Sequence, residues 1–344
     1  MYIFRADGNS IIGAGHIMRC LAIANTAKDM GESCLFIISS DELSDRIIRN
    51  GHRVHVLNSD YSNMVPDEVL LPVKENNPAV VFIDSYYVTE EFMEEVHNGC
   101  RDSNCKLVYI DDRCVTAFSC DVLINYNISA DIKSYKKLYA GKQEPEMLIG
   151  TEYVPLRKEF QDSNERTISN EAKDVLVSTG GTDAEHLLLS LINEARNHAD
   201  FRFHFIVGMM NPDKELIRQL SEGLSNIILY ENVSRIDELM RRCDVAISAS
   251  GSTLYELCAT QTPTITYILA DNQIPLAACF DEQEVMLNCG DIRTLGKETL
   301  ARSLTDSAIR LICNYIARIQ YSSKMAAIVD GKGARRIIES VQNR

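Results

Sequence analysis

The sequence is short of positive charge: 35 lysines and arginines stand against 49 aspartates and glutamates, a formal net charge of -14 in 344 residues. Nucleic-acid binding depends on a basic surface, so a nucleic-acid partner is not expected. No apolar run reaches the length of a membrane span, and Met1–Ile3 begins a strand without the basic and apolar regions of a signal peptide. We therefore expect a cytoplasmic protein with no membrane partner.

The eleven cysteines lack the close spacing of a metal site. Cys20, Cys243 and Cys258 fall within apolar or helical patterns, where a buried, reduced thiol is the simplest interpretation. Residues 100–120 hold a cluster of four cysteines, but no C-x-x-C pair occurs there. We therefore expect no bound metal and no cofactor.

Two common nucleotide-binding motifs are missing from the first glycine-rich turn, RADGNSIIGAGHIMR at residues 5–19. Met18 stands where a third glycine would complete the dinucleotide motif G-x-G-x-x-G after Gly13 and Gly15. The turn also has no lysine with which to form a Walker loop. These absences argue against hydride transfer and against P-loop hydrolysis.

The same turn joins an apolar strand at 2–4 to a helix with apolar residues from Ile17 onward. Gly13 and Gly15 let the backbone adopt positive φ and come close to a ligand, and the N–H groups of the helix start attract an anion. His16 lies at this helix start, where the helix dipole disfavours a charged ring, so a neutral, proton-accepting imidazole is expected. We interpret His16 as a general base. The alternative is a polar residue that only bonds a loop carbonyl.

Short apolar runs alternate with helical patterns through the first part of the chain. Because strands buried on both faces are continuously apolar, this pattern predicts an α/β fold with a doubly wound parallel sheet. The runs lie at residues 2–4, 34–38, 54–57, 80–84, 107–110 and 122–124.

Ligands of such sheets bind beyond the carboxyl ends of the strands. Each polar residue at a strand end also fits a helix cap or an Asx turn, so no single one is decisive. The candidates on the same edge as His16 are Asp84, Ser85, Tyr86, Asp111 and Asn127.

A polar stretch at 161–173 predicts a linker, because it has almost no large apolar side chain. A second series of strands follows it, and the first of these leads through Gly180 and Gly181 into a helix from about Ala184. The length of the chain also favours two domains. We expect an N-terminal domain at 1–160 and a second Rossmann-like domain at 174–308. The strands of the second series lie at 174–178, 203–207, 227–230, 245–248 and 263–267.

Residues 248–273 are the richest in ligand-binding groups. A strand ends there in small residues that let a diphosphate approach the amides of the next helix. Glu256, about one turn into that helix, can accept two hydrogen bonds from a ribose diol. The spacing of Thr253 and Glu256 also matches a capping box, so both interpretations stay open. The candidate nucleotide-binding residues are Ser250, Gly251, Ser252, Glu256, Asn272 and Gln273.

Five motifs together resemble a known enzyme family. They are RADGNSIIGAGHIMR (5–19), YVPLRKEF (153–160), STGGTD (178–183), SASGSTLYE (248–256) and the pair Asn272–Gln273. The set is similar to that of PseG, the nucleotide-sugar hydrolases of pseudaminic acid biosynthesis, which share the GT-B fold of MurG glycosyltransferases. The resemblance implies two Rossmann-like domains facing a cleft. It also implies that the C-terminal helices in 309–344 pack back toward the first domain.

The resemblance further implies metal-independent hydrolysis of UDP-2,4-diacetamido-2,4,6-trideoxy-β-L-altropyranose to UDP and the free sugar. Carried over by motif, His16 matches the family's catalytic base, Tyr86 its active-site tyrosine, Arg157 a substrate contact and Glu256 the nucleotide contact. The expected partner is therefore a small-molecule UDP-sugar, and the sequence indicates no oligomeric state. A UDP-sugar-dependent glycosyltransferase of the same fold is the alternative, and a non-catalytic nucleotide-sugar sensor is a third interpretation.

Overall fold

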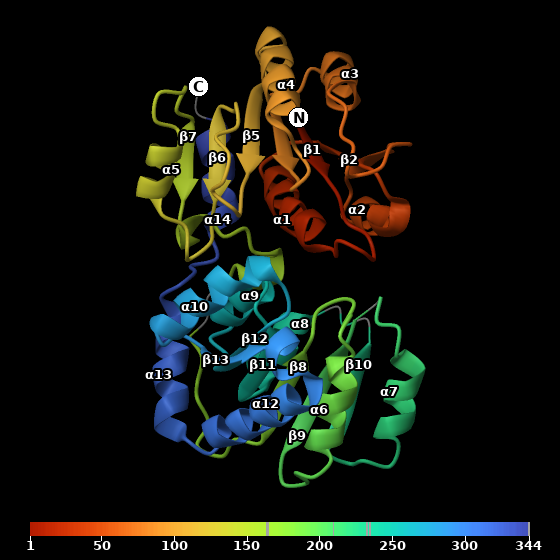
Figure 1. The fold of residues 1–344 in the computed structure, drawn as a ribbon, viewed down its shortest axis with the longest axis vertical. Helices are drawn as coiled ribbons and strands as arrows, with labels where there is room; N and C mark the ends of the chain where they lie inside the picture. Colours follow the sequence, from red (N-terminus) through yellow and green to blue (C-terminus); the bar gives the residue numbers. More distant parts are fainter. Residues whose placement is uncertain (163–164, 209, 232, 234, 343–344) are drawn as a thin grey trace. The chain divides into compact units, whose positions relative to one another are not determined.

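The structure is a computed structural model that describes residues 1–162, 165–208, 210–231, 233 and 235–342. Residues 163 and 164 of the predicted linker thus lie outside the described residues. The chain divides into unit 1, with Met1–Lys158 and Gly331–Arg344, and unit 2, with Glu159–Asp330. Each unit is built around its own β-sheet, with helices packed on the sheet (Figure 1).

Unit 1 contains a seven-stranded sheet in the order β3-β2-β1-β4-β5-β6-β7, with parallel pairing between neighbours. The order reverses between β1 and β4, so their carboxyl ends flank the topological switch point. The strands are β1 (Tyr2–Ala6), β2 (Cys34–Ile38), β3 (Arg53–Val56), β4 (Val80–Asp84), β5 (Lys106–Ile110), β6 (Val122–Asn125) and β7 (Glu146–Ile149). The α-helices are α1 (Gly15–Asp29), α2 (Ser44–Arg49), α3 (Asp67–Asn76), α4 (Glu90–Asp102), α5 (Ile132–Leu138) and α14 (Gly333–Gln342).

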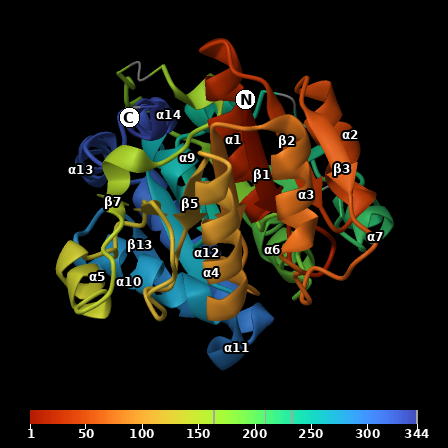
Figure 2. The ribbon, with the colours of Figure 1, turned by 90° about the horizontal axis from the view of Figure 1, so that it is seen from above.

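The two faces of this sheet are buried by different side chains, because residues alternate along each strand. On one face Phe4 of β1 stacks on Phe36 of β2 and Phe82 of β4, with ring centroids 5.0 and 4.6 Å apart. On the other face Ile3 and its neighbours form a core with residues of α3 and α4, two helices that lie side by side (Figure 2). Both faces are therefore covered, as a parallel sheet requires.

The residues after 308 divide between the units. Helix α13 (Tyr315–Ala326) packs on α9 and α12 in unit 2. Helix α14, the last of the chain, packs on α1 and on the short 3-10 helix η2 (Thr151–Tyr153) of unit 1 (Figure 1). A Cβ atom on Gly333 would lie 2.2 Å from the carbonyl oxygen of Val154, so only glycine permits this close approach.

Unit 2 contains a six-stranded parallel sheet in the order β10-β9-β8-β11-β12-β13, which reverses between β8 and β11. The predicted pair of doubly wound α/β sheets is thus confirmed. The strands are β8 (Asp174–Ser178), β9 (Arg202–Val207), β10 (Ile227–Glu231), β11 (Val245–Ala249), β12 (Thr264–Ile268) and β13 (Leu287–Asp291). The α-helices are α6 (Leu187–Ala195), α7 (Lys214–Ser221), α8 (Ile236–Arg242), α9 (Thr253–Ala259), α10 (Ile274–Glu282), α11 (Ile292–Leu295), α12 (Lys297–Ile312) and α13.

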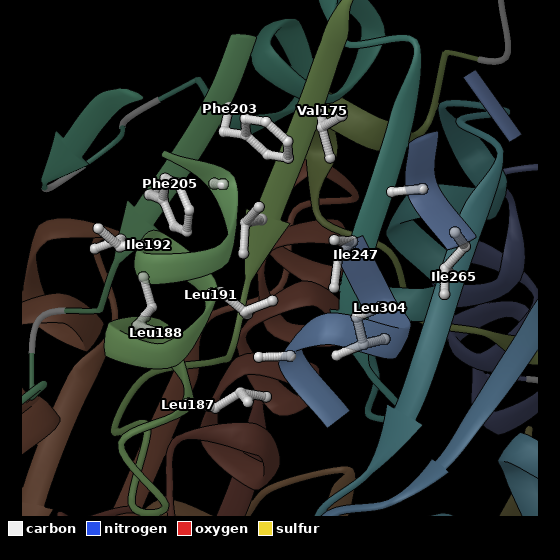
Figure 3. Packing of buried hydrophobic residues seen from close by; sticks show 14 of the residues in the cluster. Val175, Leu187, Leu188, Leu191, Ile192, Phe203, Phe205, Ile247, Ile265 and Leu304 are labelled. Atoms are coloured by element: carbon white, nitrogen blue, oxygen red, sulfur yellow. The ribbon is translucent and has the colours of Figure 1, made fainter. Parts of the chain in front are cut away.

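The core of unit 2 is formed by α6 and α12 against the sheet. Figure 3 shows Leu188 and Leu191 of α6 directed toward the strands that carry Phe205 and Ile247. Leu304 of α12 belongs to the same buried cluster. Among the helices that the structure describes, none has both the length and the apolarity needed to cross a membrane.

Several strand bounds differ from the sequence prediction by one or two residues, and one helix start and two edge strands differ by more. Helix α6 begins at Leu187 and not at about Ala184, because Asp183 caps it: the carboxylate accepts hydrogen bonds from the backbone N–H groups of Leu187 (3.2 Å) and Leu188 (3.0 Å). Strands β7 and β13, each at one edge of its sheet, were not predicted. Only Leu148 is fully buried in β7 and no residue is in β13, so neither carries a continuous apolar signal.

Arg166 fastens part of the predicted linker to unit 2. Its Nη1 donates to Thr262 Oγ1 (2.8 Å) and to the carbonyl oxygen of Met240 (3.2 Å), and its Nη2 donates to the carbonyl oxygen of Cys243. Burial lowers the pKa of Arg166 to about 10, because the guanidinium is held by neutral carbonyls. The linker is thus polar in composition but bonded to the sheet that follows it.

Candidate active site

The loop between β1 and α1 is held in shape by its own hydrogen bonds. Asn9 Oδ1 accepts from the backbone N–H groups of Ile11 and Ile12, both at 2.9 Å. Gly13 has a φ of +78°, as the sequence predicts, whereas Gly15 has no positive φ and a Cβ atom there would meet no atom within 4 Å. The prediction of positive φ at Gly15 is therefore wrong. The backbone conformation favours glycine at position 13, and close packing favours it at Gly8, where a Cβ atom would lie 2.9 Å from Ile17 Cγ1.

His16 is the second residue of α1 and faces the carboxyl end of β4. Its Nδ1 lies 2.6 Å from Oδ1 of Asp84, whose side chain is fully buried, while the His16 side chain is 12% exposed. A carboxylate can only accept a hydrogen bond, so Nδ1–H is the donor in this pair. The neutral ring then presents Nε2 as its proton acceptor, which is the arrangement a general base needs.

Arg19 lies one turn after His16 on α1 and joins Asp84 to a second carboxylate. Its Nε donates to Asp84 Oδ2 (2.6 Å), and its Nη1 donates to Asp112 Oδ1 and Oδ2 (2.9 and 2.7 Å). Its Nη2 lies 3.1 Å from His16 Nδ1. Burial alone would raise the pKa of the Asp84 carboxyl group, but Arg19 and then His16 lower it below its usual range.

Tyr86 and Asn127 both donate to Asp112. Tyr86 Oη donates to Asp112 Oδ2 (2.7 Å) and Asn127 Nδ2 donates to Asp112 Oδ1 (3.1 Å). The Tyr86 ring meets the His16 ring edge to face, with centroids 4.7 Å apart. Burial and the Asp112 carboxylate raise the pKa of Tyr86, so the phenol keeps its proton and acts as a donor.

These contacts define what we call the histidine cluster. It lies at the switch point between β1 and β4, where the doubly wound fold favours a ligand site. The sequence analysis named four of its members and missed Arg19, Asp112 and Tyr126, whose Oη accepts from Arg19 Nη1 at 3.0 Å. The i, i+3 spacing of His16 and Arg19 was the signal available for one of them. The cluster consists of His16, Arg19, Asp84, Tyr86, Asp112, Tyr126 and Asn127.

Two further candidates in unit 1 have other surroundings. Asp111 forms an Asx turn, accepting from the backbone N–H groups of Arg113 (2.8 Å) and Cys114 (2.9 Å) and from Tyr135 Oη (2.7 Å). Its side chain is thus part of the fold, as the alternative interpretation held. Arg157 is half-buried in the segment between η2 and the 3-10 helix η3 (Lys158–Phe160).

In unit 2, Gly180 and Gly181 follow β8 as predicted and are exposed. Gly180 has a φ of +88°, and a Cβ atom on Gly208 would lie 2.2 Å from the Gly181 carbonyl oxygen. The loop after β8, with Gly180 and Gly181, and the loop after β9, with Gly208, are therefore in contact through their backbones. Because Asp183 already occupies the first amides of α6, an anion beside these glycines cannot use that helix end.

The turn after β11 offers only some of its backbone amides to a ligand. Ser250 is fully buried; its N–H and Oγ both donate to the Tyr267 carbonyl oxygen, at 2.9 and 2.8 Å. The Gly251 N–H donates to the Ala249 carbonyl oxygen (2.8 Å). The N–H groups of Leu254 and Tyr255 donate to the carbonyl oxygens of Gly251 and Ser252. An anion at this turn would therefore bind the N–H groups of Ser252 and Thr253.

The helix after this turn settles the position of Glu256. Helix α9 begins at Thr253, with Ser252 as its N-cap residue, and the Ser252 side chain makes no capping hydrogen bond. Thr253 is therefore already helical, and Glu256 is the fourth residue of the helix, one position beyond a capping box. Asn272 and Gln273 lie in the 3-10 helix η4 (Asp271–Gln273) after β12, with Gln273 Oε1 accepting from the Leu269 N–H at 2.8 Å.

Comparison with known proteins gives relatives at low identity, and no protein-family model matches the chain. A Campylobacter jejuni protein named UDP-2,4-diacetamido-2,4,6-trideoxy-β-L-altropyranose hydrolase is 28% identical, covering 74% of this chain and 86% of that protein. A Helicobacter pylori protein named both as pseudaminic acid cytidylyltransferase and as this hydrolase is 25% identical, covering 83% of this chain and 47% of that protein. This chain resembles the PseG-type hydrolases. The resemblance drawn from the five motifs is thus confirmed by similarity over most of the chain.

The lengths of the relatives differ from that of this chain. An uncharacterized protein of Methanocaldococcus jannaschii is 24% identical over 80% of this chain and 56% of its own length. The chain therefore spans about half the length of this relative and of the H. pylori protein.

Solved structures with the same fold include proteins named as glycosyltransferases. MurG of Acinetobacter baumannii matches with a TM-score of 0.68 at 12% identity, over 100% of this chain and 99% of that one. The calicheamicin glycosyltransferase CalG4 matches with a TM-score of 0.65 at 13% identity, over 99% and 97%. A spinosyn rhamnosyltransferase in complex with thymidine diphosphate matches with a TM-score of 0.63 at 13% identity, over 98% and 100%. The predicted GT-B-like class is confirmed by these structures, which at such identities show the fold alone.

Proposed function

We propose that this protein hydrolyses UDP-2,4-diacetamido-2,4,6-trideoxy-β-L-altropyranose to UDP and the free sugar, with His16 as the general base. The observation that carries the proposal is the pairing of His16 Nδ1 with Asp84, which turns Nε2 into the acceptor. The names of the C. jejuni and H. pylori relatives support the substrate. The motif resemblance supports a reaction that needs no metal.

In the proposed reaction, His16 Nε2 takes a proton from a water molecule as its oxygen attacks the anomeric carbon. The bond between that carbon and the phosphate oxygen breaks, and UDP leaves with the electron pair. Asp84 holds the ring and stabilises the imidazolium that forms. Tyr86 packs against the ring and keeps its proton, so we assign it to shaping the site and not to removing a proton.

We further propose that UDP binds unit 2 at the carboxyl ends of its strands. The reversal of strand order between β8 and β11 supports this location. In this proposal the diphosphate lies beside Gly180, Gly181 and the amides of Ser252 and Thr253, and Glu256 accepts from the ribose hydroxyls. Asn272 and Gln273 complete the proposed nucleotide contacts, and Gly13, Gly15, Asn127 and Arg157 the proposed sugar-side contacts.

The second candidate function is transfer of the sugar to an acceptor, because the solved structures with this fold are glycosyltransferases. The same His16–Asp84 pair would then activate an acceptor hydroxyl in place of water. A sensor would bind UDP and release no sugar at all.

One experiment separates the three. The protein is incubated with a panel of UDP-linked diacetamido-trideoxyhexoses, with EDTA and without acceptor, and products are followed by mass spectrometry and proton NMR. The proposal expects UDP and free sugar from the altrose-configured substrate. Release that depends on an added acceptor would establish the transferase, and UDP binding without turnover of any substrate would establish the sensor.

A further inference from the structure

We propose that Arg19 is a positioning residue which, with Asp112, sets the charge that His16 experiences. This inference rests on the proposed role of His16 as the base, and it adds the residues that control how readily the ring takes up a proton. Arg19 bonds Asp84 and lies 3.1 Å from His16 Nδ1, on the side of the ring away from Nε2, and Asp112 acts through Arg19.

The first step in the argument is that Arg19 is shared. Its Nε and Nη2 face Asp84, while Nη1 faces Asp112, so one guanidinium serves two carboxylates. The side chains of Arg19, Asp84 and Asp112 are 10%, 0% and 13% exposed, which leaves little water to screen these charges. Their interaction is therefore strong, and changing one changes the field at the other two.

The second step is a count of charge. With a neutral ring, the two carboxylates and the guanidinium sum to one negative charge. Without the guanidinium the same group would carry two, one of them on Asp84 at 2.6 Å from His16 Nδ1. That unshared carboxylate would favour a proton on the ring, and a protonated ring cannot act as a base. Arg19 thus keeps Asp84 able to orient the ring while limiting its pull on the proton.

The third step concerns Asp112, which works in the opposite direction. It accepts hydrogen bonds from Arg19, Tyr86 and Asn127. Because Arg19 Nη1 is bound to Asp112, the positive charge of Arg19 balances Asp84 only in part. Neutralising Asp112 would leave Arg19 more fully available to Asp84 and would make a charged ring less favourable. Loss of Arg19 and neutralisation of Asp112 therefore have opposite consequences for the same proton.

Other charged groups around α1 are engaged elsewhere. Glu42 Oε2 accepts from the Ser10 N–H at 2.9 Å, and Arg335 of α14 pairs with Glu339 at 2.8 Å. Arg336 donates to the carbonyl oxygen of Glu152 at 2.9 Å. Within the described residues, the titratable and charged groups that face the ring or its partners include Arg19, Cys20, Asp84, Tyr86, Tyr109, Asp112, Arg113 and Tyr126.

The test is the pH dependence of sugar release in Arg19→Met, Arg19→Lys and Asp112→Asn. We expect the acidic limb of the pH–rate profile to move up by about one pH unit in Arg19→Met and down by a similar amount in Asp112→Asn. Arg19→Lys keeps the positive charge but loses the planar set of guanidinium donors. The acidic limb of the pH–rate profile should therefore stay within a few tenths of a pH unit of its wild-type position, while turnover falls. Arg113→Met is the matched control: Arg113 lies 5.9 Å from the Tyr86 ring centroid, and its loss should leave the limb in place.

A second measurement does not depend on turnover. In protein labelled with nitrogen-15 at histidine, the His16 ring signals, assigned by their loss in His16→Gln, are followed against pH without substrate. The same opposite shifts in Arg19→Met and Asp112→Asn are expected. If these appear but no variant or wild-type protein releases sugar, the proposed function fails and this inference stands.

The inference is overturned if the titration of the His16 ring does not move in Arg19→Met and Asp112→Asn, or moves in the same direction in both. This holds even if the wild-type protein is an active hydrolase. A purely structural role for Arg19 predicts that outcome, with lower turnover at every pH. If Arg19→Met does not fold, Asp112→Asn and Arg19→Lys decide the matter, because only the former is expected to move the ring titration.

Discussion

His16 Nδ1 lies 2.6 Å from Asp84 Oδ1, and the two residues belong to segments on either side of the strand reversal in unit 1. His16 follows β1 in the chain and Asp84 is the last residue of β4. β1 and β4 are paired in parallel with Ala6 opposite Asp84, so the sheet places the carboxylate beside the end of β1. The loop that follows β1 and the first turn of α1 then bring the His16 ring to it.

Replacing His16 tests the proposed base directly. We expect His16→Gln to lower turnover by about a hundred- to ten-thousand-fold, the usual contribution of general-base catalysis, with UDP affinity unchanged. Steady-state kinetics and calorimetric titration with UDP measure the two quantities. The matched control is His55→Gln, at an exposed position of β3, which should retain full turnover. Full turnover in His16→Gln would remove His16 from the mechanism.

Asp84→Asn should damage both stability and rate. Asp84 is buried against Arg19 and His16, and its neutralisation removes one of the two carboxylates that Arg19 serves. Because Asp112 still balances the guanidinium, the cost should stay below the about 3–5 kcal/mol of a buried charge left without a partner. The amide can also turn its NH₂ group toward Nδ1, which would favour the wrong ring tautomer. Chemical denaturation and kinetics below the unfolding temperature are the measurements. A variant as stable and as active as the wild type would contradict the described pairing.

Gly13→Ala and Gly15→Ala form a matched pair in one loop. At Gly13 the φ of +78° makes alanine strained, at a cost of about 1–2 kcal/mol, so this variant should unfold at a lower temperature. At Gly15 an added Cβ atom meets nothing, so stability should hold. A fall in the activity of a fully stable Gly15→Ala would locate the substrate beside this residue, and unchanged activity would exclude a close approach there.

Asp183 gives unit 2 a pH-dependent stability. Burial raises its pKa from 3.8 to about 6, so the folded form holds the proton more tightly than the unfolded chain does. The resulting stabilisation is fully present below about pH 3.8 and is lost as the pH rises through about 6, an amount of about 3 kcal/mol.

Asp183→Asn should remove this part of the pH dependence. Urea denaturation at several values between pH 4 and pH 7 should show a flatter profile for the variant than for the wild type. Asp306→Asn, at an exposed position of α12, is the control and should follow the wild type. Parallel profiles for Asp183→Asn and the wild type would show that Asp183 titrates normally.

Arg166→Met should destabilise unit 2. The change removes the Arg166 donor from the Cys243 carbonyl oxygen, at about 1–3 kcal/mol for a buried group left unsatisfied. The Met240 carbonyl oxygen loses the same donor but still accepts from Thr262 Oγ1 at 2.8 Å. Arg302→Met, at a side chain that is 70% exposed, is the control and should change stability little. Equal denaturation midpoints for the two variants would show that the hydrogen bonds of Arg166 add no more stability than an exposed arginine does.

The apolar runs of the sequence were enough to predict the central strands, because a strand buried on both faces has a strong one-dimensional signal. The edge strands β7 and β13 escaped, since a half-exposed strand with polar residues resembles a loop. The start of α6 at Leu187 was not predicted for a local reason. Asp183 caps the helix from a left-handed backbone conformation, with a φ of +48°, which the sequence pattern does not reveal.

The candidate site was predictable only in part. His16, Tyr86 and Asn127 stand beside glycines or strand ends, where position in the sequence already suggests a role. Arg19 and Asp112 are far apart in the chain. Apart from the i, i+3 spacing of Arg19 to His16, nothing in the local sequence distinguishes them from surface charges. Only the fold shows that they are paired at 2.7 Å with little exposure. Ion pairs between residues that are distant in the chain leave no periodic pattern in the sequence, so they cannot be predicted from it.

The placement of α14 on α1 has a consequence for how the protein is made. Unit 2 is contained within residues 159–330, whereas unit 1 needs residues from both ends of the chain. On the ribosome, all of unit 2 is synthesised before α14 is, and the surface of α1 that α14 covers stays bare until that helix emerges. The unit that carries His16 is therefore begun before unit 2 and completed after it.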